Sequence, residues 1–199
     1  MKFISSDLYH IYNRGNNRQQ IFFKYENYLY FLGKVRKLIL PNCDILSYCL
    51  LPNNFQFLIS ANSKTISHDE KGRNFLSEGF RHLLSSYAKG INVQEKRTGS
   101  LFTQNTHGDN VNIKSSQALE CLMYIHQTPI KTKLVDKMED WVFSSFKDYC
   151  GFRRGTICNK DLAFKLFDIC TEDFYSLSYK ILPEYHLKNF FELPIVPHF

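Results

Sequence analysis

The chain has 199 residues and a formal net charge of +6, with 44% hydrophobic and 22% charged residues. This length provides for one substantial hydrophobic core, or for one domain with an appendage. The composition is ordinary for a soluble globular protein, and no apolar run reaches the length of a membrane span. Because the first ten residues also lack the apolar region of a signal peptide, we expect a cytoplasmic protein without a membrane partner.

Basic residues are concentrated in the first two thirds of the chain. Residues 1–133 contain 17 Lys and Arg against 9 Asp and Glu, whereas residues 134–199 contain 8 against 10. This distribution favours a polyanion as partner, although ordinary solvated surface charge would give the same numbers. The six cysteines form no C-x-x-C pair and no metal-ligand spacing, so we expect free thiols, most of them buried.

The first half of the chain alternates between strand patterns and helix patterns. Period-two alternation with β-branched and aromatic residues marks the strands, and apolar residues at helical spacing mark the helices. The patterns predict, in chain order, a strand at Leu8–Asn13, a Gly/Asn loop at Arg14–Gln20, a helix from Tyr25 to about Leu40, strands at Asp44–Leu51 and Asn54–Ala61, a polar loop at 62–73, a helix from Phe75 to about Ile91, and a turn into a short strand within Lys96–Asn105.

A further helix, predicted at about Ser116–Gln127, carries a tyrosine in an unexpected place. Tyr124 lies off the apolar stripe, on the polar side of the helix, and Pro129 should end the helix soon afterwards. Two more short helices are predicted beyond Gly151, near residues 161–170 and 172–182. The apolar stripe that should face the core consists of Leu119, Leu122, Met123 and His126.

The order strand, helix, strand, strand, helix, strand is typical of a ferredoxin-like fold, an α+β antiparallel sheet with helices on one face. The first and third strands of such a sheet lie in its middle. In the third strand, alternation directs Asn54, Gln56 and Leu58 to one face and Phe55 and Phe57 to the other. Two carboxamides are thus predicted at the centre of the sheet, within reach of a packed helix, where a strand has no structural need for them.

Five segments in sequence order resemble one protein family: YHIYNRGNNRQQIFF, ILSYCLLPNNFQFLI, GSLF, YIHQTPIKTKLV and WVFSSFKDYCG. Each motif is weak alone, but their common order is specific. Together they resemble the single-tyrosine HUH transposases of the IS200-like type, and within these the REP-associated tyrosine transposases, where REP denotes a repetitive extragenic palindrome. The resemblance implies a transposase domain at 1–151, and ICNKDLAFKLFDI resembles that branch's extension, which implies a C-terminal helical extension at 152–199.

In this family, two histidines on the third strand hold Mg²⁺ or Mn²⁺ against the scissile phosphate of single-stranded DNA. A tyrosine on a helix attacks the phosphorus and forms a 5′-phosphotyrosine, and an Asn or Gln one turn later completes the metal site. The metal is needed because a phenol is a poor nucleophile near neutral pH and the phosphodiester is anionic. The resemblance places the nucleophile at Tyr124, the two histidine positions at Asn54 and Gln56, and the third ligand position at Thr128.

The tyrosine is therefore present, whereas every metal-ligand position departs from the family pattern. Amide and hydroxyl oxygens suit Mg²⁺ in hardness, but they are neutral, weak ligands, and no carboxylate is evident to anchor an ion. We therefore expect no metal cofactor, and impaired or absent DNA cleavage. The alternative is an active transposase that uses Tyr124 and a loosely held Mg²⁺ or Mn²⁺. A third possibility is a decayed protein that folds but binds no DNA.

Other histidines offer limited compensation for the missing ligands. His10, on the first strand, points either at the vacated site or into the opposite face, and the sequence leaves both directions open. His126 lies on the apolar stripe and is interpreted as a core histidine. Four further histidines are predicted in loops or in the tail, without ligand spacing: His68, His107, His186 and His198.

Binding of DNA would use residues other than those of the cleavage site, because phosphates are contacted by cations and amides and unpaired bases stack on rings. The expected partner is single-stranded or hairpin DNA, bound by a monomer, with a dimer as the alternative. Tyr12 is a candidate stacking ring beside the first loop. The candidate phosphate-contacting residues are Arg14, Asn17, Arg18, Lys64, Arg81, Lys89, Lys96, Arg97, Lys131 and Lys133.

Overall fold

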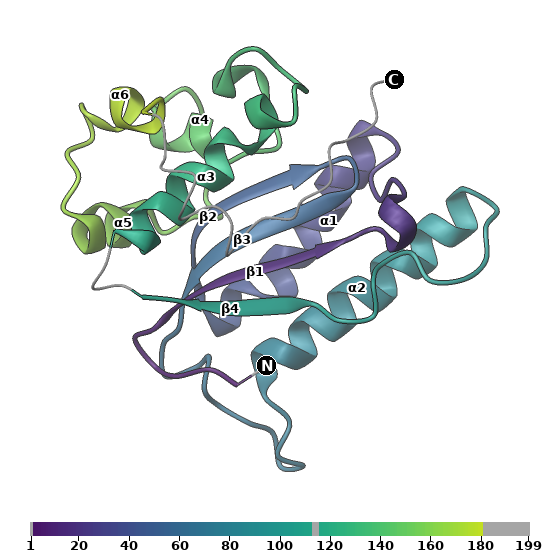
Figure 1. Ribbon diagram of the computed structural model, residues 1–199. Coiled ribbons are helices and arrows are strands. Elements are labelled where there is room, and N and C mark those ends of the chain that lie inside the picture. The colour runs from purple at the N-terminus through teal and green to yellow at the C-terminus, as the bar shows by residue number, and fades with distance from the viewer. Residues whose placement is uncertain (1, 113–115, 181–199) are drawn as a thin grey trace.

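The computed structural model describes residues 2–112 and 116–180 of the chain. Its strands and helices follow the order expected from the sequence up to the C-terminal segment (Figure 1). In chain order they are β1 (Leu8–Arg14), η1 (Asn16–Arg18), α1 (Tyr25–Leu38), η2 (Leu40–Asn42), β2 (Asp44–Leu51), β3 (Asn54–Ser60), α2 (Phe75–Gln94), β4 (His107–Val111), α3 (Gln117–Lys131), η3 (Met138–Asp140), α4 (Phe146–Tyr149), α5 (Lys160–Phe167) and α6 (Phe174–Ser178).

The four strands form one antiparallel sheet in the order β2-β3-β1-β4, so β3 and β1 are central (Figure 1). The predicted α+β, ferredoxin-like fold class is confirmed. The fourth strand, however, is His107–Val111, not a segment within Lys96–Asn105 as the sequence suggested. Phe102 makes only an isolated bridge with Gly15. The apolar residues of the predicted segment are explained by burial, since the Phe102 ring lies in the core. The true fourth strand, β4, is a polar edge strand and has no apolar alternation that would identify it.

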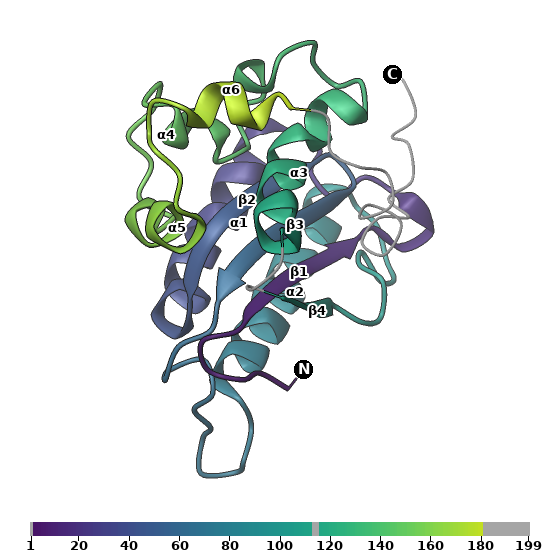
Figure 2. The ribbon, with the colours of Figure 1, turned by 60° about the vertical axis from the view of Figure 1, so that its left-hand side comes forward.

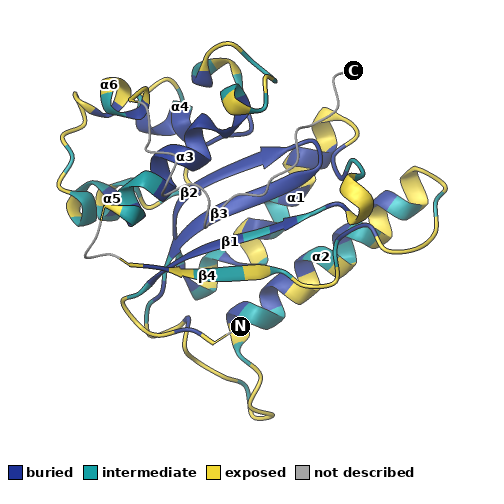
Figure 3. Ribbon diagram, viewed as in Figure 1, coloured by how far each residue is buried: buried dark blue, intermediate teal, exposed yellow. Residues whose placement is uncertain are grey.

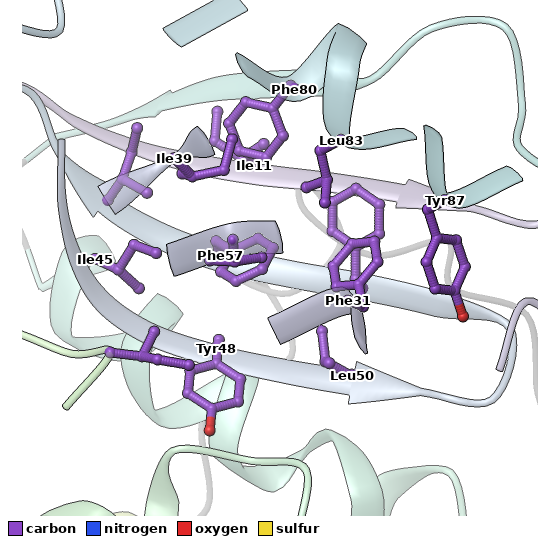
Figure 4. Close-up of a cluster of buried hydrophobic side chains, with 14 of the residues drawn as sticks. Ile11, Phe31, Ile39, Ile45, Tyr48, Leu50, Phe57, Phe80, Leu83 and Tyr87 are labelled. Atoms are coloured by element: carbon purple, nitrogen blue, oxygen red, sulfur yellow. The ribbon is translucent and has the colours of Figure 1, made fainter. Parts of the chain in front are cut away.

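Helices α1 and α2 cover one face of the sheet and form a large aromatic core with it (Figure 4). Phe55 and Phe57 project from β3 into this core, where they meet Phe31 of α1 and Phe80 of α2. Helix α2 begins where the Asn74 side chain accepts a hydrogen bond from the Ser77 amide, a standard N-cap. Burial of each large ring contributes about 1.5–3 kcal/mol, so this layer anchors the sheet.

Helix α3 covers the opposite face, over β2 and β3, with α4, α5 and α6 packed around it (Figures 1 and 2). It is therefore enclosed on nearly all sides, and every residue from Cys121 to Pro129 is buried (Figure 3). The expectation that Tyr124 stands on a polar side is wrong, since only 7% of it is exposed. The predicted apolar stripe meets the C-terminal segments through Met123 and His126, whereas the side with Thr128 faces β3. Helical periodicity identified the stripe, but it could not show that the sheet covers this second side.

Pro129 does not end α3, which continues to Lys131. A proline removes one amide donor and disfavours the helix, but it need not terminate it. Two threonines support the backbone around this proline. Thr128 donates its hydroxyl to the Tyr124 carbonyl at 2.8 Å, and Thr132 donates to the Thr128 carbonyl at 2.8 Å.

The C-terminal segment belongs to the same core as α3. Phe146, Tyr149 and Phe174 lie on or after α4 and place their rings around His126. The buried Asp148 forms an ion pair with Arg153, whose guanidinium also donates to backbone carbonyls. All six cysteines are free thiols. Among the described residues, none of the helices combines the length and apolar character needed to cross a bilayer.

His126 is confirmed as a core histidine. It is fully buried, and its Nε2 lies 2.7 Å from the Ser145 hydroxyl. Burial lowers its pKa from 6.5 to about 3, because the charged imidazolium would lose its hydration. The folded protein therefore holds this ring neutral at pH values where the unfolded chain would protonate it.

This difference predicts a specific pH dependence of stability. Between pH 3 and 6.5 the unfolded state binds one more proton at His126, so the free energy of unfolding should decrease on acidification. The slope is about 1.4 kcal/mol per pH unit for one proton. In His126→Gln, urea unfolding between pH 4.5 and 6 should give a slope smaller by that amount. An unchanged slope in this variant would show that His126 titrates normally in the fold.

Candidate functional site

The central polar site lies between β3 and α3. As the alternation in β3 predicted, Leu58 belongs to the core under α3 and Phe55 and Phe57 to the core under α1 and α2. Asn54 and Gln56 therefore face α3, and both are almost fully buried. The structure thus brings the two carboxamides to the helix that carries Tyr124 and Thr128.

Gln56 joins three secondary-structure elements through its side-chain amide. Its Oε1 lies 3.1 Å from Nε2 of His10 on β1, and its Nε2 is 3.5 Å from the Thr128 hydroxyl on α3. The Thr128 hydroxyl in turn donates to the carbonyl of Tyr124. The contact with His10 is a normal hydrogen bond, whereas the one with Thr128 is at the outer limit of distance. The carboxamide of Gln56 is therefore engaged by protein groups at both ends.

The direction of His10, which the sequence left open, is now determined. Its ring points to the same face as Gln56 and is fully buried. Burial lowers its pKa to about 4, against a weaker opposing effect of the hydrogen bond to Gln56. A neutral imidazole has one N–H, and the partner atom is a carbonyl oxygen, so Nε2 carries the proton and donates it to Gln56.

Asn54 is the first residue of β3, next to the turn that leads from β2. Its side-chain nitrogen donates to Oδ1 of Asn53 at 2.9 Å. Its own Oδ1 is buried, and within the described residues it has no hydrogen-bond partner. Arg14 is its cross-strand neighbour on β1 and therefore projects from the same face of the sheet.

Tyr124 is held in a largely apolar environment. Burial raises the pKa of its phenol well above the usual value of 10. The ammonium group of Lys131, two helical turns later, lies 5.1 Å from the centre of the phenol ring, close enough for a cation–π interaction. This lysine thus provides a positive charge at the tyrosine.

The predicted phosphate-contacting residues fall into separate groups. Arg14 and Lys131 lie beside the polar site, and Lys133 follows Lys131. Asn17 and Arg18 are exposed in the loop after β1, and Arg97 is tied to that loop by a 2.7 Å hydrogen bond to Gln19. The four remaining candidates are exposed: Lys64 lies in the loop 61–74, Arg81 and Lys89 lie on α2, and Lys96 lies just after α2. Arg81 is ion-paired with Glu78.

The sequence analysis did not predict the contact between a β4 side chain and β1. His107 is not in a loop, as predicted, but begins β4 opposite Tyr12 of β1, and the two rings stack at a centroid distance of 4.9 Å. Tyr12 also donates a 3.0 Å hydrogen bond to Asp109. The sequence offered no alternation as a signal here, because Val111 is the only large apolar residue of β4 and Gly108 and Asn110 do not favour a strand.

No protein-family model matches the chain, and no curated protein sequence matches it. Among solved structures, the fold is similar to that of a REP-associated tyrosine transposase bound to a REP hairpin. The TM-score is 0.57 at 14% sequence identity, and the match covers 76% of this chain and 83% of the transposase. At this identity the likeness establishes the common fold.

The hydrogen bonds of Gln56 can be tested by stability measurements. Gln56→Met keeps the volume but leaves His10 without its acceptor, so the free energy of unfolding should fall by about 1–3 kcal/mol. A double-mutant cycle with His10→Phe should give a larger coupling energy than one with Thr128→Val, because the second contact is longer. Equal coupling in both cycles, or none, would contradict the arrangement. Urea unfolding of the single and double variants supplies the values.

Proposed function

We propose that this protein binds single-stranded or hairpin DNA through a transposase fold whose cleavage site no longer holds a divalent metal ion. The observation that carries the proposal is the engagement of Gln56 by His10 and Thr128 at a position where the resembling family has a metal-binding histidine. The match to a transposase solved with a DNA hairpin supports the binding function.

The donor groups at this site do not fit Mg²⁺ or Mn²⁺. Gln56 Oε1 and Thr128 Oγ1 are neutral oxygens, and each already accepts one hydrogen bond, so each keeps only one of its two lone pairs. His10 presents its Nε2 proton to Gln56, so that atom cannot act as a ligand. The Asn54 oxygen has no hydrogen-bond partner among the described residues, but a single neutral oxygen is too weak to hold a divalent ion. In the described part of the chain, no cluster of three or more His, Cys, Asp or Glu side chains could provide a site elsewhere.

Without a metal, the tyrosine is poorly prepared for attack on a phosphodiester. Burial keeps the Tyr124 phenol protonated at neutral pH, since its pKa lies well above 10. The nearby charge of Lys131 can attract a phosphate, but a single lysine does not replace a divalent ion in stabilising the transition state. The same charge remains useful for binding.

Binding of the DNA backbone requires only cations on the correct face. Arg14 and Lys131 come from different elements and lie at the two sides of the polar site. Both lie on the α3 side of the sheet, where the candidate tyrosine is also located. We therefore infer that phosphates of a single strand pass between these two residues.

Hairpin binding without cleavage is the first prediction of this proposal. A labelled REP-type DNA hairpin should bind in fluorescence anisotropy, and four phosphate contacts would weaken the affinity roughly 50-fold between about 50 and 200 mM salt. Arg14→Ala and Lys131→Ala should each reduce both the affinity and the salt dependence. Lys37→Ala, an exposed change on α1 at the opposite face, serves as control and should have no effect.

The same hairpin distinguishes the two candidate activities. Incubated with Mg²⁺ or Mn²⁺, the protein should form no denaturant-resistant adduct with DNA. An adduct that disappears in Tyr124→Phe would establish the active alternative. Absence of affinity for any hairpin at low salt would instead favour the decayed protein that binds nothing.

Returning the family's metal-binding residues to this site should restore binding of a divalent ion. The triple variant Asn54→His, Gln56→His, Thr128→Asn returns imidazole and amide donors to the positions of the family pattern, and calorimetry should then detect Mn²⁺ uptake that the unmodified protein lacks. Equal uptake by both proteins would contradict the inferred loss of the site. No uptake by a folded triple variant would mean that the shape of the site has changed as well.

A further inference from the structure

Three aromatic side chains form a continuous column on β1 and β4. The rings of His10 and Tyr12 stack at 4.8 Å with an angle of 27° between their planes, and those of Tyr12 and His107 at 4.9 Å and 11°. His10 and Tyr12 are two residues apart on β1 and share a face, and His107 is the register partner of Tyr12 on β4. The column therefore crosses the sheet from the polar site toward its edge.

The column passes from the interior to solvent. His10 is fully buried, Tyr12 is partly exposed and His107 is exposed. One face of the His107 ring is covered by Tyr12. Because β4 is the last strand of the described sheet, no further strand lies beyond it to cover the other face. The column thus ends in a ring that can accept another planar group.

The middle ring is fixed by polar contacts. The Tyr12 hydroxyl donates to Asp109, and burial together with this carboxylate raises the pKa of Tyr12 to about 12, so the hydroxyl keeps its proton near neutral pH. His10 is fixed by Gln56. A planar group that stacks on His107 would therefore meet a platform that is already ordered, which reduces the entropy lost on binding.

We propose that this column is a stacking site for an unpaired nucleobase of single-stranded DNA, which packs on the outer face of His107. The inference rests on the proposed DNA-binding function and specifies a contact for it. Arg14 projects from the same face of β1, two residues beyond Tyr12, and can pair with the phosphate of the stacked nucleotide. Asp109 disfavours a phosphate directly over β4, so the base faces this strand and the backbone lies toward Arg14.

The experiment measures base-dependent affinity. The DNA ligand is the labelled hairpin with an unpaired single-stranded flank, and a series of oligonucleotides replaces one flank base at a time by an abasic unit. His107→Ala should weaken binding of the intact ligand roughly 5- to 150-fold, the range expected for loss of one base–ring stack. The abasic ligand for the stacked position should lose a similar factor with the unmodified protein and show no further loss with His107→Ala.

Two further variants distinguish a loss of base stacking from a loss of fold stability. His107→Phe keeps a planar ring and should retain most of the affinity. His68→Ala removes an exposed histidine in the loop between β3 and α2 and should bind as the unmodified protein does. A ring that only stabilises the strand pair would lower the melting temperature in His107→Ala without any base dependence.

The outcomes distinguish this inference from the function on which it rests. If the unmodified protein binds the hairpin but His107→Ala binds equally well, the stacking site is overturned and the DNA-binding proposal stands. The stacking site is also overturned if His107→Ala weakens intact and abasic ligands by the same factor. If the unmodified protein binds no DNA at low salt, both proposals fail together.

Discussion

The enclosure of α3 between the sheet and the C-terminal helices determines the character of the whole site. A helix covered on both sides cannot expose its tyrosine, and each polar group on it must find a partner inside the protein. Thr128 bonds to its own helix, and Gln56 reaches from the sheet to meet it. These contacts link β1, β3 and α3 and place Tyr124 at a fixed depth above the central strands.

The same contacts support the proposal that the site binds DNA without cleaving it. A divalent ion is held best by charged or strongly basic ligands, and the groups at this site are neutral and partly engaged in hydrogen bonds with one another. The loss of metal ligands does not remove the positive charges of Arg14, beside Asn54, and Lys131, beside Tyr124. Loss of a metal and retention of a DNA surface are therefore physically compatible in this fold.

On the β4 side, the sheet face offers a different kind of contact. The column that ends at His107 is aromatic along its length, and it continues from the polar site to the sheet edge. A strand of DNA with its phosphates near Arg14 and one base on His107 would run along β1 and β4, beside the tyrosine helix. Charge and stacking would thus act on the same ligand from adjacent rows of side chains.

Residue patterns alone predicted the α+β class and most of the element order. They also predicted that Asn54 and Gln56 share a face, because period-two alternation in a central strand fixes which side chains point the same way. The sequence also identified His126 as a core residue from its place on an apolar stripe. The fourth strand escaped this reasoning, since a polar edge strand carries little apolar signal. Three features could be established only from the folded chain: His10 bonds to Gln56, Tyr124 is buried, and His107 completes a ring column. Each of these depends on which segments, distant in sequence, pack against one another, and local periodicity does not encode that choice.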